Sequence, residues 1–104
     1  MELERIQYRG FKPREEVHRD VQRVAQKILD ESRVSGQVRL VISDQGDRFH
    51  ISVVGTSRNK LFSSESLHKK SEMQGWPRAW QLGAIAELLS DFMAQIRKTF
   101  KSLE

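Results

Sequence analysis

The sequence contains no cysteine, and this absence excludes disulfide bridges, thiol catalysis and cysteine-based zinc sites. It also fits a reducing compartment. No uninterrupted apolar run approaches the roughly 20 residues that a membrane-spanning helix needs. The residues after Met1, ELERIQ, lack the basic start and apolar middle of a signal peptide. We therefore expect a cytoplasmic protein that has no membrane partner.

Motifs that carry catalysis are also missing. His18, His50 and His68 lie far apart in the sequence and share no ligand or base spacing such as HExxH. The acidic segment SDQGD lacks the succession of oxygen ligands and the closing glutamate of a calcium loop, and a hairpin turn explains it. The serines form no nucleophile elbow, and the glycines form neither a Walker loop nor a GxGxxG motif. We therefore expect that the protein is not an enzyme and that it has no metal site, no cofactor and no small-molecule substrate.

The apolar residues change their spacing in an orderly way along the chain, without an internal repeat or a linker. This predicts one domain over residues 1-104. Alternating apolar positions predict strands, and spacings of three and four predict helices. The predicted elements are a strand at 3-9, a helix at 14-33, strands at 37-43 and 48-55, a weaker edge strand at 59-66, an irregular connection at 67-78 and a final helix.

Each predicted helix carries one apolar stripe. The first stripe consists of Val17, Val21, Val24, Ala25 and Ile28, and Gly36 follows where a helix would stop. The second consists of Ile85, Leu88, Leu89, Phe92, Ile96, Phe100 and Leu103. Together the patterns predict an α+β fold of order β-α-β-β-β-α, with a four-stranded, mostly antiparallel sheet and both helices packed on one face. The residues expected between the helices and the sheet are Val21, Ile28, Leu88, Phe92 and Ile96.

Eighteen Lys and Arg against fourteen Asp and Glu give a net charge of +4, which permits a polyanionic partner. Basic residues gather in both predicted helices. Arg19, Arg23 and Lys27 follow one another at spacings of four, nearly opposite the apolar stripe, although acidic residues nearly balance that helix. Arg97 and Lys101 form a second such pair with Lys98 beside it, and cations there also suit a helix C-terminus. Each cluster therefore fits either a binding surface or an ordinary solvated face.

The predicted connection before the second helix is rich in Lys69, Lys70 and Arg78, and two tryptophans lie close to that helix start. Trp76 and Trp80 are residue types that can stack on nucleic-acid bases. A tryptophan beside a helix start more often closes the edge of a core, and we favour that interpretation.

Two stretches of the sequence resemble the ribosome hibernation-promoting factor and ribosome-associated inhibitor family. IQYRGFKPREEVHRDVQRVAQKIL is similar to the family's opening strand, turn and basic first helix, and QIRKTFKSL is similar to the end of its second helix. The family has the same order of elements, and the resemblance covers most of the chain. Two departures are the longer segment 67-78 and the helix start KPREE, where the family has a threonine-type cap.

The resemblance implies a non-catalytic cytoplasmic protein that binds the small ribosomal subunit. It would contact the subunit's RNA, block the channel used by messenger and transfer RNA, and so inhibit or protect dormant ribosomes. The chain ends where the family's short members end, so no dimerising domain is expected. The RNA-binding residues that the resemblance implies are Arg23, Lys27, Arg97, Lys98 and Lys101, with Arg9, Lys12 and Arg19 as weaker additions.

Two alternatives remain open. A double-stranded RNA-binding module has the order α-β-β-β-α, and HKK at 68-70 precedes the second helix as basic residues do in that module, but the strand at 3-9 would be surplus. A protein-interaction domain without a nucleic-acid role is favoured by the near-neutral first helix. It is also favoured by the small residues along one flank of the second helix, which are Gly83, Ala86, Ser90 and Ala94.

Overall fold

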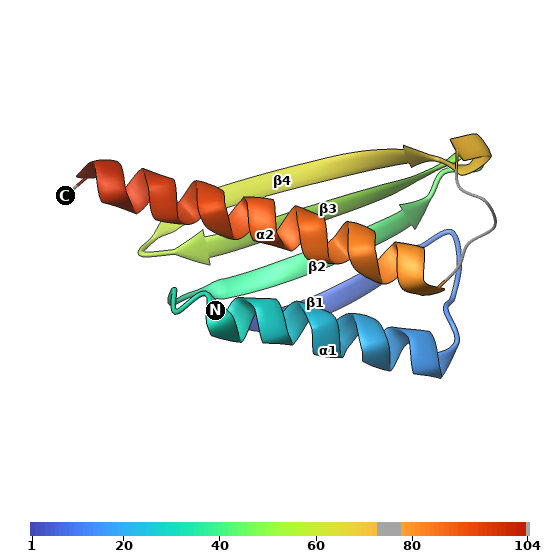
Figure 1. Cartoon of the computed structure of the whole chain (residues 1–104), viewed down its shortest axis with the longest axis horizontal. Coiled ribbons are helices and arrows are strands. Elements are labelled where there is room, and N and C mark those ends of the chain that lie inside the picture. The colour runs from blue at the N-terminus through green and yellow to red at the C-terminus, as the bar shows by residue number, and fades with distance from the viewer. Residues whose placement is uncertain (73–77, 104) are drawn as a thin grey trace.

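The computed structural model describes residues 1-72 and 78-103, and side chains within 1-72 and 82-101 (Figure 1). The predicted order β-α-β-β-β-α is confirmed. The elements are β1 (Glu2–Arg9), α1 (Glu15–Glu31), β2 (Gln37–Asp44), β3 (Arg48–Ser57), β4 (Lys60–Lys69), a short 3-10 helix (Lys70–Glu72) and α2 (Arg78–Leu103). No helix in these described ranges is long and apolar enough to cross a membrane.

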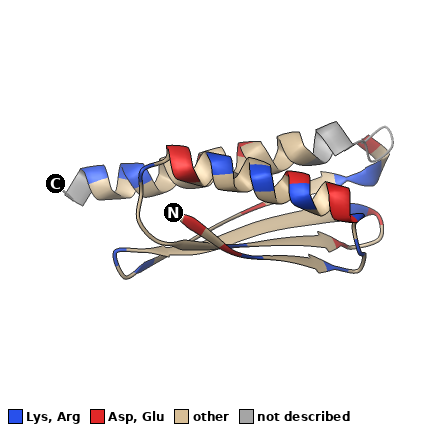
Figure 2. Ribbon diagram, turned by 90° about the horizontal axis from the view of Figure 1, so that it is seen from below, with Lys and Arg blue, Asp and Glu red and all other residues tan. Residues whose placement is uncertain are grey.

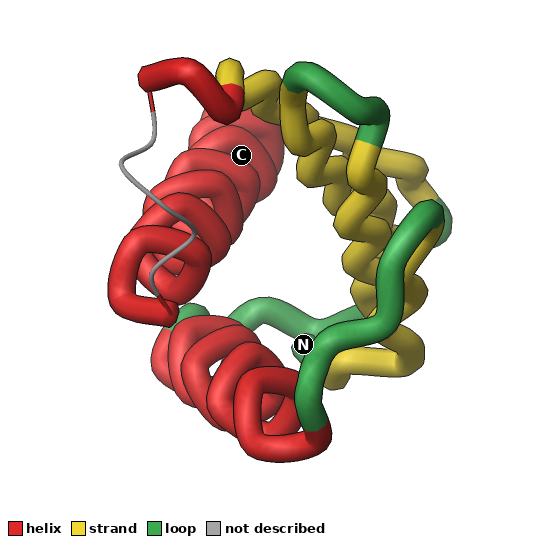
Figure 3. The backbone as a smooth tube through the Cα atoms, turned by 90° about the vertical axis from the view of Figure 1, so that its right-hand side faces the viewer, coloured by secondary structure: helices red, strands yellow, loops and turns green. Residues whose placement is uncertain are grey.

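The four strands form one sheet in the order β1-β2-β3-β4. β1 runs parallel to β2, and the other two pairs are antiparallel. A parallel neighbour needs a crossover connection, which α1 supplies. Both helices cover the same face of the sheet, as the end-on view in Figure 3 shows, and they run in the same direction, so that both end at one end of the molecule (Figure 1). The predicted mostly antiparallel sheet with helices on one face is confirmed.

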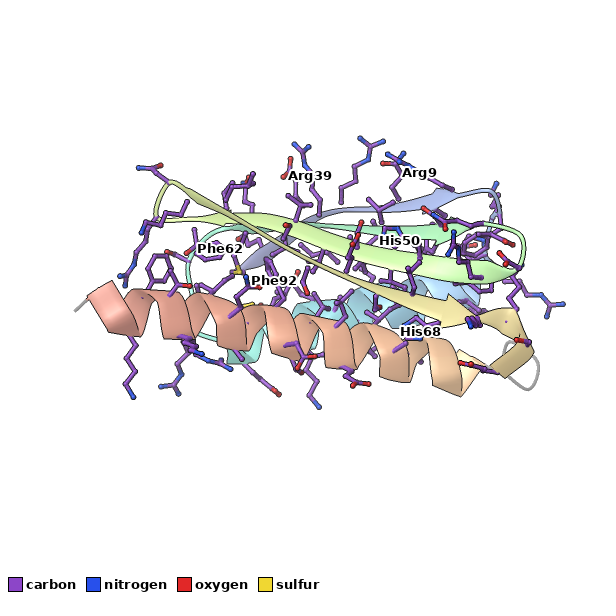
Figure 4. The ribbon with its side chains drawn as sticks, turned by 90° about the horizontal axis from the view of Figure 1, so that it is seen from above. Arg9, Arg39, His50, Phe62, His68 and Phe92 are labelled. Carbon is purple, nitrogen blue, oxygen red and sulfur yellow. The ribbon has the colours of Figure 1, made fainter. Side chains whose placement is uncertain are left out.

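The core lies between this sheet face and the helices. Alternate strand residues such as Val38, Leu40 and Ile51 are fully buried, because every second side chain of a strand points to the same face. Phe92 of α2 is also fully buried, and Figure 4 shows it with Phe62 between α2 and the sheet. The stripe predicted for the second helix is confirmed from Ile85 to Phe100, while the side chain of Leu103 lies outside the described part.

The buried stripe of α1 is rotated slightly from the predicted one. Val21, Ala25 and Leu29 have no exposed surface, whereas Ile28 is only partly buried, so the predicted burial of Ile28 is wrong. The reason is that α1 packs on the sheet along a line of i, i+4 neighbours. That line places Leu29, which the pattern omitted, over the sheet.

The end of α1 also differs from the prediction. The helix ends at Glu31, and Arg33 takes the left-handed conformation that follows many helices, with φ of 56°. Gly36 has another role. A Cβ on Gly36 would lie 2.0 Å from the backbone oxygen of Thr56, so this glycine allows β2 to begin against β3.

β4 is longer than predicted, and the predicted irregular connection is wrong for residues 67-72. The strand pairs with β3 as far as Lys69, which lies opposite Arg48, because ladder hydrogen bonds compensate for its poor apolar content. The next residue, Lys70, donates to Asp44 Oδ1 at 2.7 Å and so fastens the 3-10 helix to the β2–β3 turn. Gly75, Trp76 and Pro77 lie outside the described residues, as do the side chains of Arg78 and Trp80.

Candidate nucleic-acid interface

The first candidate surface is the exposed face of α1. Arg19, Arg23 and Lys27 lie on this face, directed away from the sheet, as the helical spacing predicts. Glu15 accepts from Arg19 at 2.8 Å, and Asp20 pairs with Arg23 at 3.4 Å. Positive and negative residues therefore alternate along α1, as Figure 2 shows. Two of the three cations are already paired with carboxylates, so this surface attracts an anion less strongly than three unpaired cations would.

A shallow depression of about 800 Å³ follows this face. Its lining includes the three cations, but it also includes Asp30 and Glu31. Asp30 accepts a hydrogen bond of 2.7 Å from Gln26. The depression is therefore a mixed polar surface, and the near balance of charge seen in the sequence is present in space as well.

The second candidate surface lies at the end of α2. Arg97, Lys98 and Lys101 are all exposed there, and Figure 2 shows this end of the helix as predominantly basic among the described residues. Lysine and arginine in the last turns of a helix also interact favourably with the negative end of its dipole. The three residues share the exposed side of the helix end, as their spacing predicted.

Two further cations, Arg33 and Arg58, join this surface, and the sequence did not indicate them. They line a pocket of about 300 Å³ together with Arg97 and Lys101. Arg33 comes from the loop after α1, and Arg58 comes from the turn between β3 and β4. A single arginine in a turn has no periodic neighbours, so no local spacing could identify it. Only the strand order and the common direction of the helices bring these segments together.

Arg9 and Lys12 do not belong to either surface. Arg9 lies at the end of β1, and its side chain points from the sheet away from the helices (Figure 4). Lys12 is exposed in the loop that follows. That loop lies at the opposite end of the molecule from the end of α2 (Figure 1). The structure therefore divides the eight predicted residues among three places: the face of α1, the end of α2, and the β1–α1 corner.

The sheet face away from the helices carries exposed apolar side chains. Val54, Leu61 and Leu67 are 38%, 72% and 56% exposed and come from β3 and β4. Polar contacts cross the same face, including one of 2.8 Å between His50 Nε2 and Glu65 Oε2. This surface is mixed in character and is distinct from the basic end of α2.

Among the residues whose side chains the structure describes, two titratable groups have shifted pKa values, and both have structural explanations. Burial raises the pKa of Tyr8 to about 12, and its hydroxyl lies 3.0 Å from His18 Nδ1. The hydrogen bond from Lys70 and a second from the backbone of Gly46 lower the pKa of Asp44. Neither group lies among the helix cations. Within 1-72 and 78-103, no group of three His, Asp or Glu is placed to hold a metal ion.

Solved structures share this fold from end to end. The N-terminal domain of Protein Y from Thermus thermophilus is 12% identical, with a TM-score of 0.65 over 95% of this chain and 99% of that one. A ribosomal subunit interface protein from Coxiella burnetii is 7% identical, with a TM-score of 0.55 over 99% of this chain and 97% of that one. The fold that the resemblance in the sequence implied is therefore confirmed. At these identities the comparison shows a shared fold. No family model and no curated protein matches the sequence.

Proposed function

We propose that this chain is a non-catalytic, ribosome-associated protein of the cytoplasm. It binds the RNA of the small ribosomal subunit through the basic surface of its helices, and it inhibits or protects dormant ribosomes by occupying the channel for messenger and transfer RNA. The observation that carries the proposal is the fold, which is shared over nearly the whole length of both chains with a ribosomal subunit interface protein.

The distribution of charge supports the same proposal. Arg97, Lys98 and Lys101 lie together on the exposed side of α2, where they can approach phosphates without moving the core. Arg23 and Lys27 on α1 belong to the same helix layer. An interface with folded RNA depends largely on such phosphate contacts, which fix its position and provide much of its affinity.

The first strand argues against a generic double-stranded RNA-binding module. β1 pairs with β2 along its length, from Glu2 opposite Gln37 to Arg9 opposite Ser43. β1 is thus the edge strand of the sheet, whereas a double-stranded RNA-binding module begins with its first helix and has no such strand. The protein-interaction alternative is favoured by one specific observation, the exposed Leu61 and Leu67 on the open sheet face. That surface lies on the other side of the sheet from the basic helices, so the two proposals can be tested with separate variants.

The test is co-sedimentation with purified small subunits over a range of salt concentrations. We expect a variant with Arg97, Lys98 and Lys101 changed to Gln to bind more weakly. The slope of log affinity against log salt should fall by roughly two to three units, about one for each phosphate contact. A matched control changes three exposed cations of the strands, Arg5, Arg48 and Lys69, to Gln. It removes the same charge and should retain most of the affinity and slope.

Naked double-stranded RNA provides the second arm of this experiment. A clear preference for the subunit over the duplex supports ribosome association. Equal affinity for both would favour the generic RNA-binding module. If the triple variant binds subunits as tightly as the parent, with the same salt slope, the surface at the end of α2 is not the interface. Loss of binding in a Leu61→Ser, Leu67→Ser variant would then support a protein partner.

A further inference from the structure

The pocket at the end of the helices is formed by three segments that are distant in the sequence. The loop after α1 contributes Arg33 and Ser35, the β3–β4 turn contributes Arg58, and the last turns of α2 contribute Arg97, Phe100 and Lys101. All three segments meet at the end of the molecule where both helices end (Figure 1). The volume, about 300 Å³, is at the lower limit of the range for ligand pockets in proteins. It fits a small group better than a large ligand.

The charge of this pocket is not compensated by its own lining. Four cations line it, and its described lining contains no carboxylate. None of the four forms an ion pair with a carboxylate in the ranges that the structure describes. Glu31 borders the adjoining depression with Arg97, but the two are not among the ion pairs of the described residues. The α1 face is different, because Arg19 and Arg23 are already paired there. Four like charges around one small space repel one another, and a bound anion would relieve that repulsion.

Two of the four cations, Arg33 and Arg58, occupy backbone positions that suit other residues better. Arg33 has φ of 56° and Arg58 has φ of 50°, in the left-handed region where glycine and asparagine are favoured. Arg58 is also the first residue of a two-residue hairpin turn, a position at which Asn or Gly is preferred. Arginine therefore carries a conformational cost at both sites. A role for the two side chains explains why both positions are arginine.

Local contacts hold the pocket in shape. The Arg58 guanidinium carbon lies 4.6 Å from the centroid of the Phe100 ring, a cation–π distance that fixes the group above the ring and leaves its N–H edges available. The neighbouring Ser57 hydroxyl donates to the backbone oxygen of Ser35 at 2.6 Å. That hydrogen bond joins the end of β3 to the loop after α1, so Arg33 and Arg58 are held close to one another before a ligand arrives.

We propose that this pocket binds a phosphate group, held mainly by Arg33 and Arg58 with Arg97 and Lys101 completing the ring of charge. Planar guanidinium groups suit the oxygens of a phosphate, because each can donate two parallel hydrogen bonds. The group comes either from an RNA backbone or from a free phosphate compound. The RNA source rests on the proposed function, whereas the pocket itself does not.

The test uses a variant with Arg33→Asn and Arg58→Asn. Asparagine tolerates the left-handed conformation, so the fold should be retained while both guanidinium groups are lost. The matched control is Arg14→Asn with Arg48→Asn, which removes two exposed arginines elsewhere. The probes are inorganic pyrophosphate and a ten-nucleotide oligouridylate. Affinity and location are both measured from the chemical-shift changes of backbone amides at low salt.

The parent should bind both probes, with the largest chemical-shift changes near Arg33, Arg58 and Phe100. The double variant should bind each probe at least tenfold more weakly per arginine removed, and the control should match the parent.

The outcomes separate the two sources. Weaker binding of both probes by the double variant supports an RNA phosphate in the pocket. Weaker binding of pyrophosphate alone supports the pocket and identifies its ligand as a free phosphate compound. Equal binding by parent and double variant, or no saturable binding by the parent, overturns the proposal. Co-sedimentation of the parent with small subunits is measured in parallel and decides the proposed function independently. A melting temperature lower in the double variant than in the parent, without a change in either affinity, would show that the arginines serve only the helix ends.

Discussion

Gly55 in the middle of the sheet determines how closely α2 can approach, and its replacement by alanine provides a sharp test of the packing. A Cβ at this position would lie 3.0 Å from Phe92 Cζ, 2.9 Å from the backbone oxygen of Gln37 and 3.2 Å from Val38 Cγ2. Phe92 has no exposed surface, and Gln37 is held in the β2–β3 ladder, so neither can move away without cost. Forcing a methyl group into a packed core costs about 1–3 kcal/mol. Alanine also reduces the conformational entropy of the unfolded chain relative to glycine, which offsets about 0.4–1 kcal/mol of that cost. We expect Gly55→Ala to lower the free energy of unfolding by about 1–2 kcal/mol.

The measurement is denaturant unfolding of Gly55→Ala beside Gly83→Ala. Gly83 lies on the exposed side of α2, where an added Cβ meets no described atom within 4 Å. Alanine there should stabilise the helix by up to about 1 kcal/mol, so the two substitutions should have opposite signs. The cost of Gly55→Ala should also fall when Phe92→Leu is present, because the ring atom that the new Cβ meets is then absent. A Gly55→Ala variant as stable as the parent, or more stable, would refute this account of the contact between sheet and helix.

Three further predictions follow from the same structure. Leu88 is 5% exposed, so Leu88→Ala should cost about 2–5 kcal/mol of unfolding free energy, and a loss below about 0.5 kcal/mol would place it outside the core. Arg14 occupies the N-cap of α1 without a side-chain hydrogen bond, so Arg14→Ser should raise stability by about 0.5–2 kcal/mol, measured by thermal unfolding. Burial raises the pKa of Tyr8 to about 12, so the folded state retains the phenol proton more strongly than the unfolded state and loses stability as pH rises from about 10 to 12. Tyr8→Phe should show a shallower decline over that range, and equal slopes would contradict the assignment.

The sequence predicted the elements of this fold because their signals are periodic. Ile85, Leu88, Leu89 and Phe92 repeat at helical spacing, and the alternation around Leu40 and Ile51 defines two strands without reference to the rest of the chain. The length of β4 was underestimated because its serines gave no apolar signal. Its pairing with β3 is decided by backbone hydrogen bonds that no side-chain pattern reports.

The candidate site was predicted only in part, for a related reason. Arg97, Lys98 and Lys101 are neighbours on one helix, so their grouping follows from spacing alone. Arg33 and Arg58 meet them only because α1 and α2 run in the same direction and the β3–β4 turn lies at the same end of the sheet. Arg9 and Lys12 were grouped with the helix cations by the resemblance. The sheet carries them to the opposite end of the molecule.

The parallel pairing of β1 with β2 has a consequence for local unfolding of the sheet. Short turns join β2, β3 and β4, so their ladders close small loops, whereas β1 reaches β2 only after the whole of α1 has been ordered. The three-stranded meander can therefore persist while β1 and α1 separate from it together. Because α1 carries half of the basic helix layer, such an opening would alter the spacing between its cations and those of α2 without unfolding the other three strands. Amide protons of β1 would then exchange with solvent sooner than those of β3, which is protected by partners on both sides.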